Sequence, residues 1–227
     1  MSSKSVELPA PLRWLTGIAA LCSAFLAMDS LRLFSESPLL DFVITLQNHY
    51  YYALIGLLLP LCYLLNPSFR SPKSYLFDGV LSLAAFVSCI FFFINTENML
   101  DYGWEFSAPG YAIWMSYLLW ALIMEAVRRT GGWVLFTLVL VFSLYPIFAE
   151  NLPGPISGMA SSLGETAGYH VMSIESILGL PFRAFAQLVI GFLIFGIALQ
   201  QTGGGRFFIN LAFAAFGHVR GGSAKVA

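Results

Sequence analysis

Residues 76–94 read LFDGVLSLAAFVSCIFFFI, and this stretch decides the fold class. It carries one charged side chain, Asp78, in an otherwise unbroken apolar run. A helix that crosses the hydrocarbon core of a bilayer needs roughly 20 mostly apolar residues. A barrel strand would alternate apolar and polar residues, whereas a helix satisfies its own backbone hydrogen bonds in lipid. The stretch therefore predicts a transmembrane helix.

The composition extends this prediction to the whole chain. Of its 227 residues, 10% are charged and 58% are hydrophobic. Soluble domains carry about 25% charged residues, so this chain has too few to cover a water-exposed surface. The formal net charge of −1 gives no basic surface for nucleic acid. We expect the lipid bilayer to be the main surrounding of this protein, and nucleic acid not to be a partner.

Similar apolar runs recur along the sequence and predict a polytopic, all-α bundle of about six transmembrane helices. The expected spans are 14–33, 50–65, 76–94, 109–127, 133–149 and 181–199. Tyrosines and tryptophans near their ends, including Tyr50, Tyr51 and Tyr52, are typical of an interfacial belt. Two further stretches, 161–178 and 203–222, are too polar or too short to span. The first predicts a short interfacial helix, and the second a short interfacial or re-entrant helix.

The basic residues predict the orientation. With six spans, only Arg32 and Arg183 among the basic residues fall on one side, which also carries most acidic loop residues. The other side carries Lys4, Arg13, Arg70, Lys73, Arg128, Arg129, Arg206, Arg220 and Lys225. Because basic loops stay in the cytoplasm, we expect a multi-pass membrane protein with a cytoplasmic N-terminus.

One charged group near the end of the fourth expected span is a candidate site. Glu125 stands three residues before Arg128 and four before Arg129, so all three share one helix face. The simplest interpretation is a topology anchor with an interfacial ion pair. The alternative is a packing contact between two parts of a larger transporter.

A second candidate lies in the loop after the third expected span, where Glu97, Asp101 and Glu105 fall on the predicted outer side. The preferred interpretation of these carboxylates is solvated loop charge. The three histidines are scattered and form no metal motif, and no catalytic centre is visible. From residues alone, a transporter or channel subunit is the leading class, ahead of a membrane assembly module and of an intramembrane enzyme.

Three stretches resemble the membrane component of tripartite ATP-independent periplasmic (TRAP) transporters, most closely the fused permeases associated with TAXI-type binding proteins. Residues 124–133, MEAVRRTGGW, look like the junction between the small and large subunits of these permeases. Residues 144–148, LYPIF, followed by LPG at 152–154, are the second stretch. The third and most specific covers 202–212, TGGGRFFINLA, and 216–227, FGHVRGGSAKVA.

The resemblance implies an ion-gradient-driven secondary transporter, not an enzyme, that imports organic acids or related small solutes. The coupling ion is usually sodium, no other cofactor is expected, and a periplasmic binding protein delivers the substrate. Given such a partner, Glu97, Asp101 and Glu105 are a possible docking site for it, as an alternative to solvated loop charge. Residues 1–132 would form a static, small-subunit-like scaffold of four helices, and residues 133–227 would begin the large transport domain.

The resemblance also limits what these 227 residues are expected to do. The substrate and sodium sites of the family would lie beyond residue 227, so no substrate-binding or metal residue is assigned, and residues 1–227 alone are not expected to transport. A module that binds a partner membrane protein without carrying solute remains the alternative.

Overall fold

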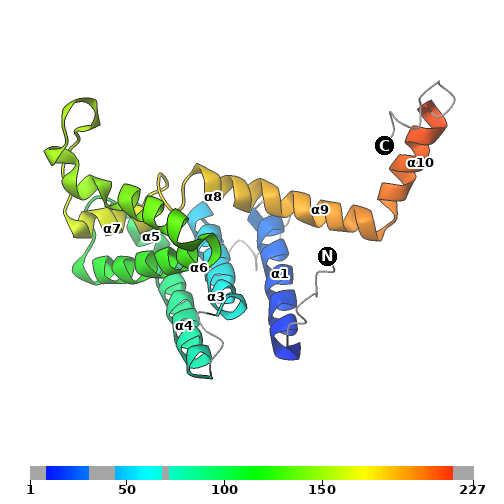
Figure 1. Cartoon of the computed structure of the whole chain (residues 1–227), viewed down its shortest axis with the longest axis horizontal. Helices are drawn as coiled ribbons and strands as arrows, with labels where there is room; N and C mark the ends of the chain where they lie inside the picture. Colours follow the sequence, from blue (N-terminus) through cyan, green and yellow to red (C-terminus); the bar gives the residue numbers. More distant parts are fainter. Residues whose placement is uncertain (1–8, 31–43, 68–71, 217–227) are drawn as a thin grey trace.

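The computed structural model describes residues 9–30, 44–67 and 72–216, and every regular element among them is helical. Three helices run side by side: α1 (Ala10–Ser30), α3 (Gln47–Leu65) and α4 (Pro72–Ile94) (Figure 1). The all-α membrane fold predicted from the sequence is thereby confirmed. Lys4, Arg32, Arg70, Arg220 and Lys225 lie outside the described residues, as do the ends of the predicted stretches 14–33 and 203–222.

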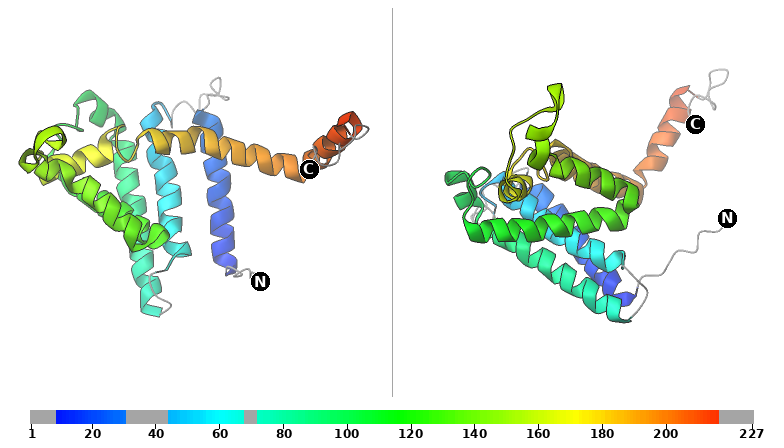
Figure 2. Two further views of the ribbon diagram at one scale, coloured as in Figure 1. Left: turned by 45° about the horizontal axis from the view of Figure 1, so that its top comes forward. Right: turned by 60° about the vertical axis from the view of Figure 1, so that its left-hand side comes forward.

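Helix α3 stands between α1 and α4 and is the most buried of the three (Figure 2). It packs closely on α4 because Gly56 presents no side chain there, and a Cβ at this position would lie 3.0 Å from the Cβ of Cys89. Small residues allow helix backbones to approach in this way, which increases van der Waals contact where lipid supplies no hydrophobic driving force. Helices α3 and α4 therefore form a closely packed pair, and α1 lies on the other side of α3.

The long helical run α6 (Gly110–Phe148) is folded back on itself at Gly132. Gly132 has φ 75° and ψ −177°, a conformation open essentially only to glycine. The first half of α6 lies steeply inclined against α3 and α4, and the second half returns beside the first (Figure 2). The fourth and fifth predicted spans are thus two arms of one bent helix.

Shorter elements follow these arms. Helix α5 (Thr96–Asp101) precedes α6, the 3-10 turns η1 (Ala149–Asn151) and η2 (Gly154–Ile156) follow it, and α7 (Leu163–Met172) packs against it. A last run joins α8 (Leu180–Ala184), the π-helix η3 (Phe185–Val189) and α9 (Ile190–Gln201), and crosses α1 (Figure 1). Helix α10 (Gly204–Phe216) then projects away from the other helices.

Four described helices are long and apolar enough to cross a membrane: Ala10–Ser30, Tyr75–Ile94, Gly110–Asn151 and Leu180–Gln201. The predicted second span is helix α3, which falls outside this set because its first turn is polar, with Gln47, Asn48 and His49. The division into spans therefore differs from the six predicted, although the helix boundaries agree to within a few residues.

The three consecutive tyrosines of α3 are not a lipid-facing belt. Tyr50, Tyr51 and Tyr52 are each 1% exposed and lie in the core of the protein. Their hydroxyl groups bond to residues more than a hundred positions away in the chain. The sequence showed only that these tyrosines lie near the end of a span, which is true of lipid-facing tyrosines and of buried ones. The belt interpretation was therefore wrong for these three residues.

Candidate functional site: an ion-paired helix junction

Arg129, near the bend of α6, joins three helices through one guanidinium group. Its Nε donates to the Oε1 of Glu125 at 2.8 Å, and its Nη1 donates to the Oδ1 of Asp78 on α4 at 2.7 Å. The same Nη1 reaches the carbonyl oxygen of Asn66, which follows α3, at 3.1 Å. The guanidinium carbon also lies 4.9 Å from the ring centroid of Tyr63 on α3. One side chain therefore connects α3, α4 and α6.

Arg128 also donates to Glu125, but it connects different parts of the structure. Its Nε and Nη2 each donate to the Glu125 carboxylate at 2.7 Å, which is the bidentate geometry that favours arginine over lysine. Its guanidinium carbon lies 5.1 Å from the ring centroid of Trp133, on the far side of the bend at Gly132. Arg128 thus connects the two arms of α6.

The two arginines differ in burial. The side chains of Arg129 and Asp78 are 3% and 2% exposed, whereas those of Arg128 and Glu125 are 27% and 26% exposed. Two cationic and two anionic side chains give a group with no net charge, so it does not attract an anion or a cation by charge alone. A buried group of side chains whose charges balance is typical of a structural contact between helices.

The sequence predicted part of this cluster. The contacts of Glu125 with both arginines are found at the spacing of three and four that predicted them. Tyr63 and Asp78 were missed as partners, and Asp78 was noted only as the one charged side chain in an apolar run. It lies 51 positions from Arg129, and no local pattern connects the two. The role of this cluster as a topology anchor stays a prediction.

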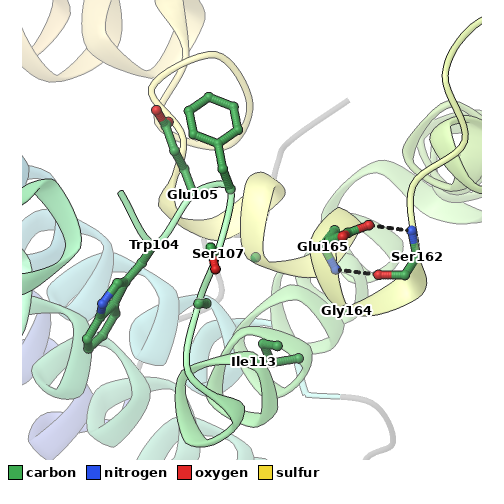
Figure 3. A pocket seen from close by; sticks show the side chains of 10 residues that line it. Trp104, Glu105, Ser107, Ile113, Ser162, Gly164 and Glu165 are labelled. Carbon is green, nitrogen blue, oxygen red and sulfur yellow. Dashed lines mark hydrogen bonds between the residues drawn. The ribbon is translucent and has the colours of Figure 1, made fainter. Parts of the chain in front are cut away.

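The acidic residues of the predicted outer loop differ in their surroundings. Glu97 and Asp101 are exposed on α5, and neither lines the cavity of about 220 Å³ that lies between the loop after α5 and helix α7. Glu105 does line this cavity, opposite Glu165 (Figure 3). Figure 3 also shows the Glu165 carboxylate turned back toward Ser162, so the two carboxylates do not converge as an acid–base pair.

Glu165 and Ser162 instead begin helix α7. The Glu165 carboxylate accepts from the backbone N–H of Ser162 at 2.7 Å, and the Ser162 hydroxyl accepts from the backbone N–H of Glu165 at 3.2 Å. This reciprocal pair is a capping box, which satisfies two N–H groups that the first helical turn leaves free. The bond from the Ser162 backbone lowers the pKa of the Glu165 carboxyl. These contacts explain why a helix starts here.

Helix α7 is held between the two arms of α6 by His170. Its Nε2 lies 2.8 Å from the Ser143 carbonyl oxygen, its Nδ1 lies 2.6 Å from the Ser176 hydroxyl, and its ring packs on Trp120. Trp120 in turn donates to the Ser143 hydroxyl at 2.9 Å. Within the described residues, no group of three or more His, Cys, Asp or Glu side chains is placed to hold a metal ion.

Comparison with known proteins gives one match. Residues 118–227 match the family model described as "Tripartite ATP-independent periplasmic transporter, DctM component". No curated protein and no solved structure matches the chain. The matched segment begins within the first arm of α6, so it includes Glu125, both arginines and the bend at Gly132. Over residues 118–227 the chain is therefore similar to the DctM component of tripartite ATP-independent periplasmic transporters.

Proposed function

We propose that this chain is the membrane permease of a TRAP transporter of the fused type, in which small-subunit-like and large-subunit-like parts are continuous. The family match over residues 118–227 carries this proposal. Helices α1, α3 and α4 precede the matched segment and pack against it, which supports a scaffold that is joined to the large part. The proposed division is a scaffold over residues 1–132 and the start of the transport domain over 133–227.

The permease imports organic acids or related small solutes across a bacterial inner membrane, and an inward sodium gradient drives this import. A periplasmic binding protein of the TAXI type delivers the solute, and the N-terminus of the permease lies in the cytoplasm. The buried contacts of Arg129 support a rigid scaffold, because they connect α3, α4 and α6.

Uptake in proteoliposomes tests this function. The complete gene product is reconstituted with the binding protein encoded beside it, and radiolabelled organic acids are added outside. We expect uptake that requires the binding protein and an inward sodium gradient but no ATP. Equal uptake with potassium in place of sodium would refute the coupling. Stable binding of a partner membrane protein with no uptake of any solute would favour the non-transporting assembly module instead.

We also propose that Glu97, Asp101 and Glu105 contribute to docking of the binding protein. Two of these carboxylates are exposed and the third borders the cavity beside α7, so together they offer acidic surface on the side proposed to be periplasmic. Exposed charges of this kind act mainly on association rate and lose their effect in salt.

Charge reversal provides the test of docking. The triple variant to lysine should slow association with the binding protein about tenfold at low ionic strength and much less at 0.5 M salt. Reversal of the exposed Glu150 on η1 is the matched control and should leave association unchanged. An unchanged association rate in the triple variant would remove the docking role without affecting the transport proposal.

A further inference from the structure

The helical run from Leu180 to Gln201 contains an irregular turn. At η3 the backbone N–H of Ile190 bonds to the carbonyl of Phe185, five residues earlier, where an α-helix would use the residue four earlier. Such π-turns are rare and occur mostly as single turns within α-helices, often at functional positions. The turn holds about one residue more than an α-turn, so it changes the rotation of every residue that follows it.

Two tyrosines of α3 bond to this turn. The Tyr50 hydroxyl donates to the carbonyl oxygen of Ala186 at 2.5 Å. The side-chain amide of Gln187 donates to the Tyr51 hydroxyl at 2.9 Å. Ala186 and Gln187 both belong to η3, so successive residues of one helix bind successive residues of the other.

The surroundings of these tyrosines make the contact specific. Both rings are 1% exposed, and the ring of Phe182 packs edge-on against Tyr51 with the centroids 5.9 Å apart. The neighbouring Tyr52 faces elsewhere and donates to the carbonyl of Val171 on α7 at 2.9 Å. A buried hydroxyl that loses its partner is costly, so these bonds favour one register of the turn over its alternatives.

We propose that Tyr50 and Tyr51 are positioning residues that hold the π-turn at Phe185–Val189, and that they thereby set the rotation of α9 about its own axis. If the π-turn relaxes to an α-turn, each residue that follows the turn moves to the place of the next residue in the sequence. This movement is a rotation of about 100° around the helix axis and a shift of about 1.5 Å along it. Helix α9 packs on α1, so its contact face depends on this register. The inference concerns the placement of α9 and does not depend on what is transported.

The relaxed register predicts which residues of α9 exchange places. Ile194 is partly buried against the core, whereas Leu193 is 57% exposed. After relaxation, residue 193 would occupy the protected position and residue 194 the exposed one. The two positions therefore report the register directly.

Spin labels at 193 and 194 provide the measurement, in the full chain in nanodiscs and on a background without the native cysteines. The accessibility of each label to oxygen is read by electron paramagnetic resonance. In the double variant Tyr50→Phe/Tyr51→Phe we expect label 194 to become accessible and label 193 to become protected. Deletion of Leu188 from the double variant removes the one residue by which the π-turn exceeds an α-turn. The labels attached to the original residues 193 and 194 should then regain the accessibilities that they have in the parent.

Tyr63→Phe is the matched control. Tyr63 is also fully buried and its hydroxyl bonds to a backbone carbonyl, that of Leu122, but it does not touch η3. The control should keep the parent pattern. The proposal is overturned if the double variant keeps the parent pattern, or if Tyr63→Phe exchanges the two positions equally.

Hydrogen exchange gives a second measurement if the double variant does not accumulate. Each single variant, Tyr50→Phe or Tyr51→Phe, should speed amide exchange over residues 186–191 about tenfold, the size expected for the loss of one buried hydrogen bond. Exchange in α4 should not change. Unchanged exchange over 186–191 in both single variants would also overturn the proposal.

Discussion

Replacement of Arg129 by methionine should destabilise this protein far more than the same replacement at Arg128. Both arginines bond to Glu125, and they are neighbours in the sequence. They differ in burial, with 3% of the Arg129 side chain exposed against 27% for Arg128. The pair therefore separates the effect of burial from the effect of losing a bond to Glu125.

The structure sets the size of the difference. Arg129→Met removes the guanidinium from Asp78, which is 2% exposed, and breaking a buried ion pair costs about 3–5 kcal/mol. The same substitution also removes the bond to the Asn66 carbonyl and the contact with the Tyr63 ring. A partly exposed pair contributes about 0.5 kcal/mol, so Arg128→Met should cost at most about 1 kcal/mol. A difference of about 3 kcal/mol is more than 100-fold in the unfolding equilibrium.

The free energy of unfolding is measured in mixed micelles by titration with denaturing detergent, followed by tryptophan fluorescence. The double variant Asp78→Leu/Arg129→Met should recover part of the loss, because a buried ion pair can be replaced by apolar side chains at little cost. Equal losses for Arg128→Met and Arg129→Met would refute the reasoning. A double variant less stable than Arg129→Met alone would refute it as well.

Three further substitutions, with Gly191→Ala as a control, test local structure. Gly132→Ala should cost about 1–3 kcal/mol of unfolding free energy because φ at this position is 75°. Gly191→Ala, within helix α9, should instead be neutral or stabilise by about 0.5–1 kcal/mol, because a Cβ added there would meet no other atom within 4 Å. Ser162→Ala should reduce hydrogen-exchange protection of α7 because the capping box is lost. The pKa of Glu165 is lower in the folded protein, so its contribution to α7 is present above the ordinary value of 4.5 and is lost as pH falls below it. Protection of α7 should therefore decrease at acid pH in the parent, and this extra decrease should be absent in Glu165→Gln.

The family resemblance could be predicted from the sequence because short, ordered motifs carry it. The stretches at 124–133 and 202–227 lie within the segment that matches the DctM component. The expected boundary between the two parts, after residue 132, lies inside this match, and residue 132 is also where α6 bends. The role of the acidic loop could not be read from charge alone, because exposed carboxylates look the same whether they bind a partner or water.

The sequence by itself determined the helical class, the approximate helix ends and the contacts of Glu125 with Arg128 and Arg129. Each of these depends on residues within about 20 positions of one another, through hydrophobic run length or helical periodicity. Only the tertiary structure decided that Asp78 pairs with Arg129 and that Tyr50 and Tyr51 bind the π-turn. These contacts join helices that are distant in the chain, and their partners are set by how the helices pack, which no local pattern encodes.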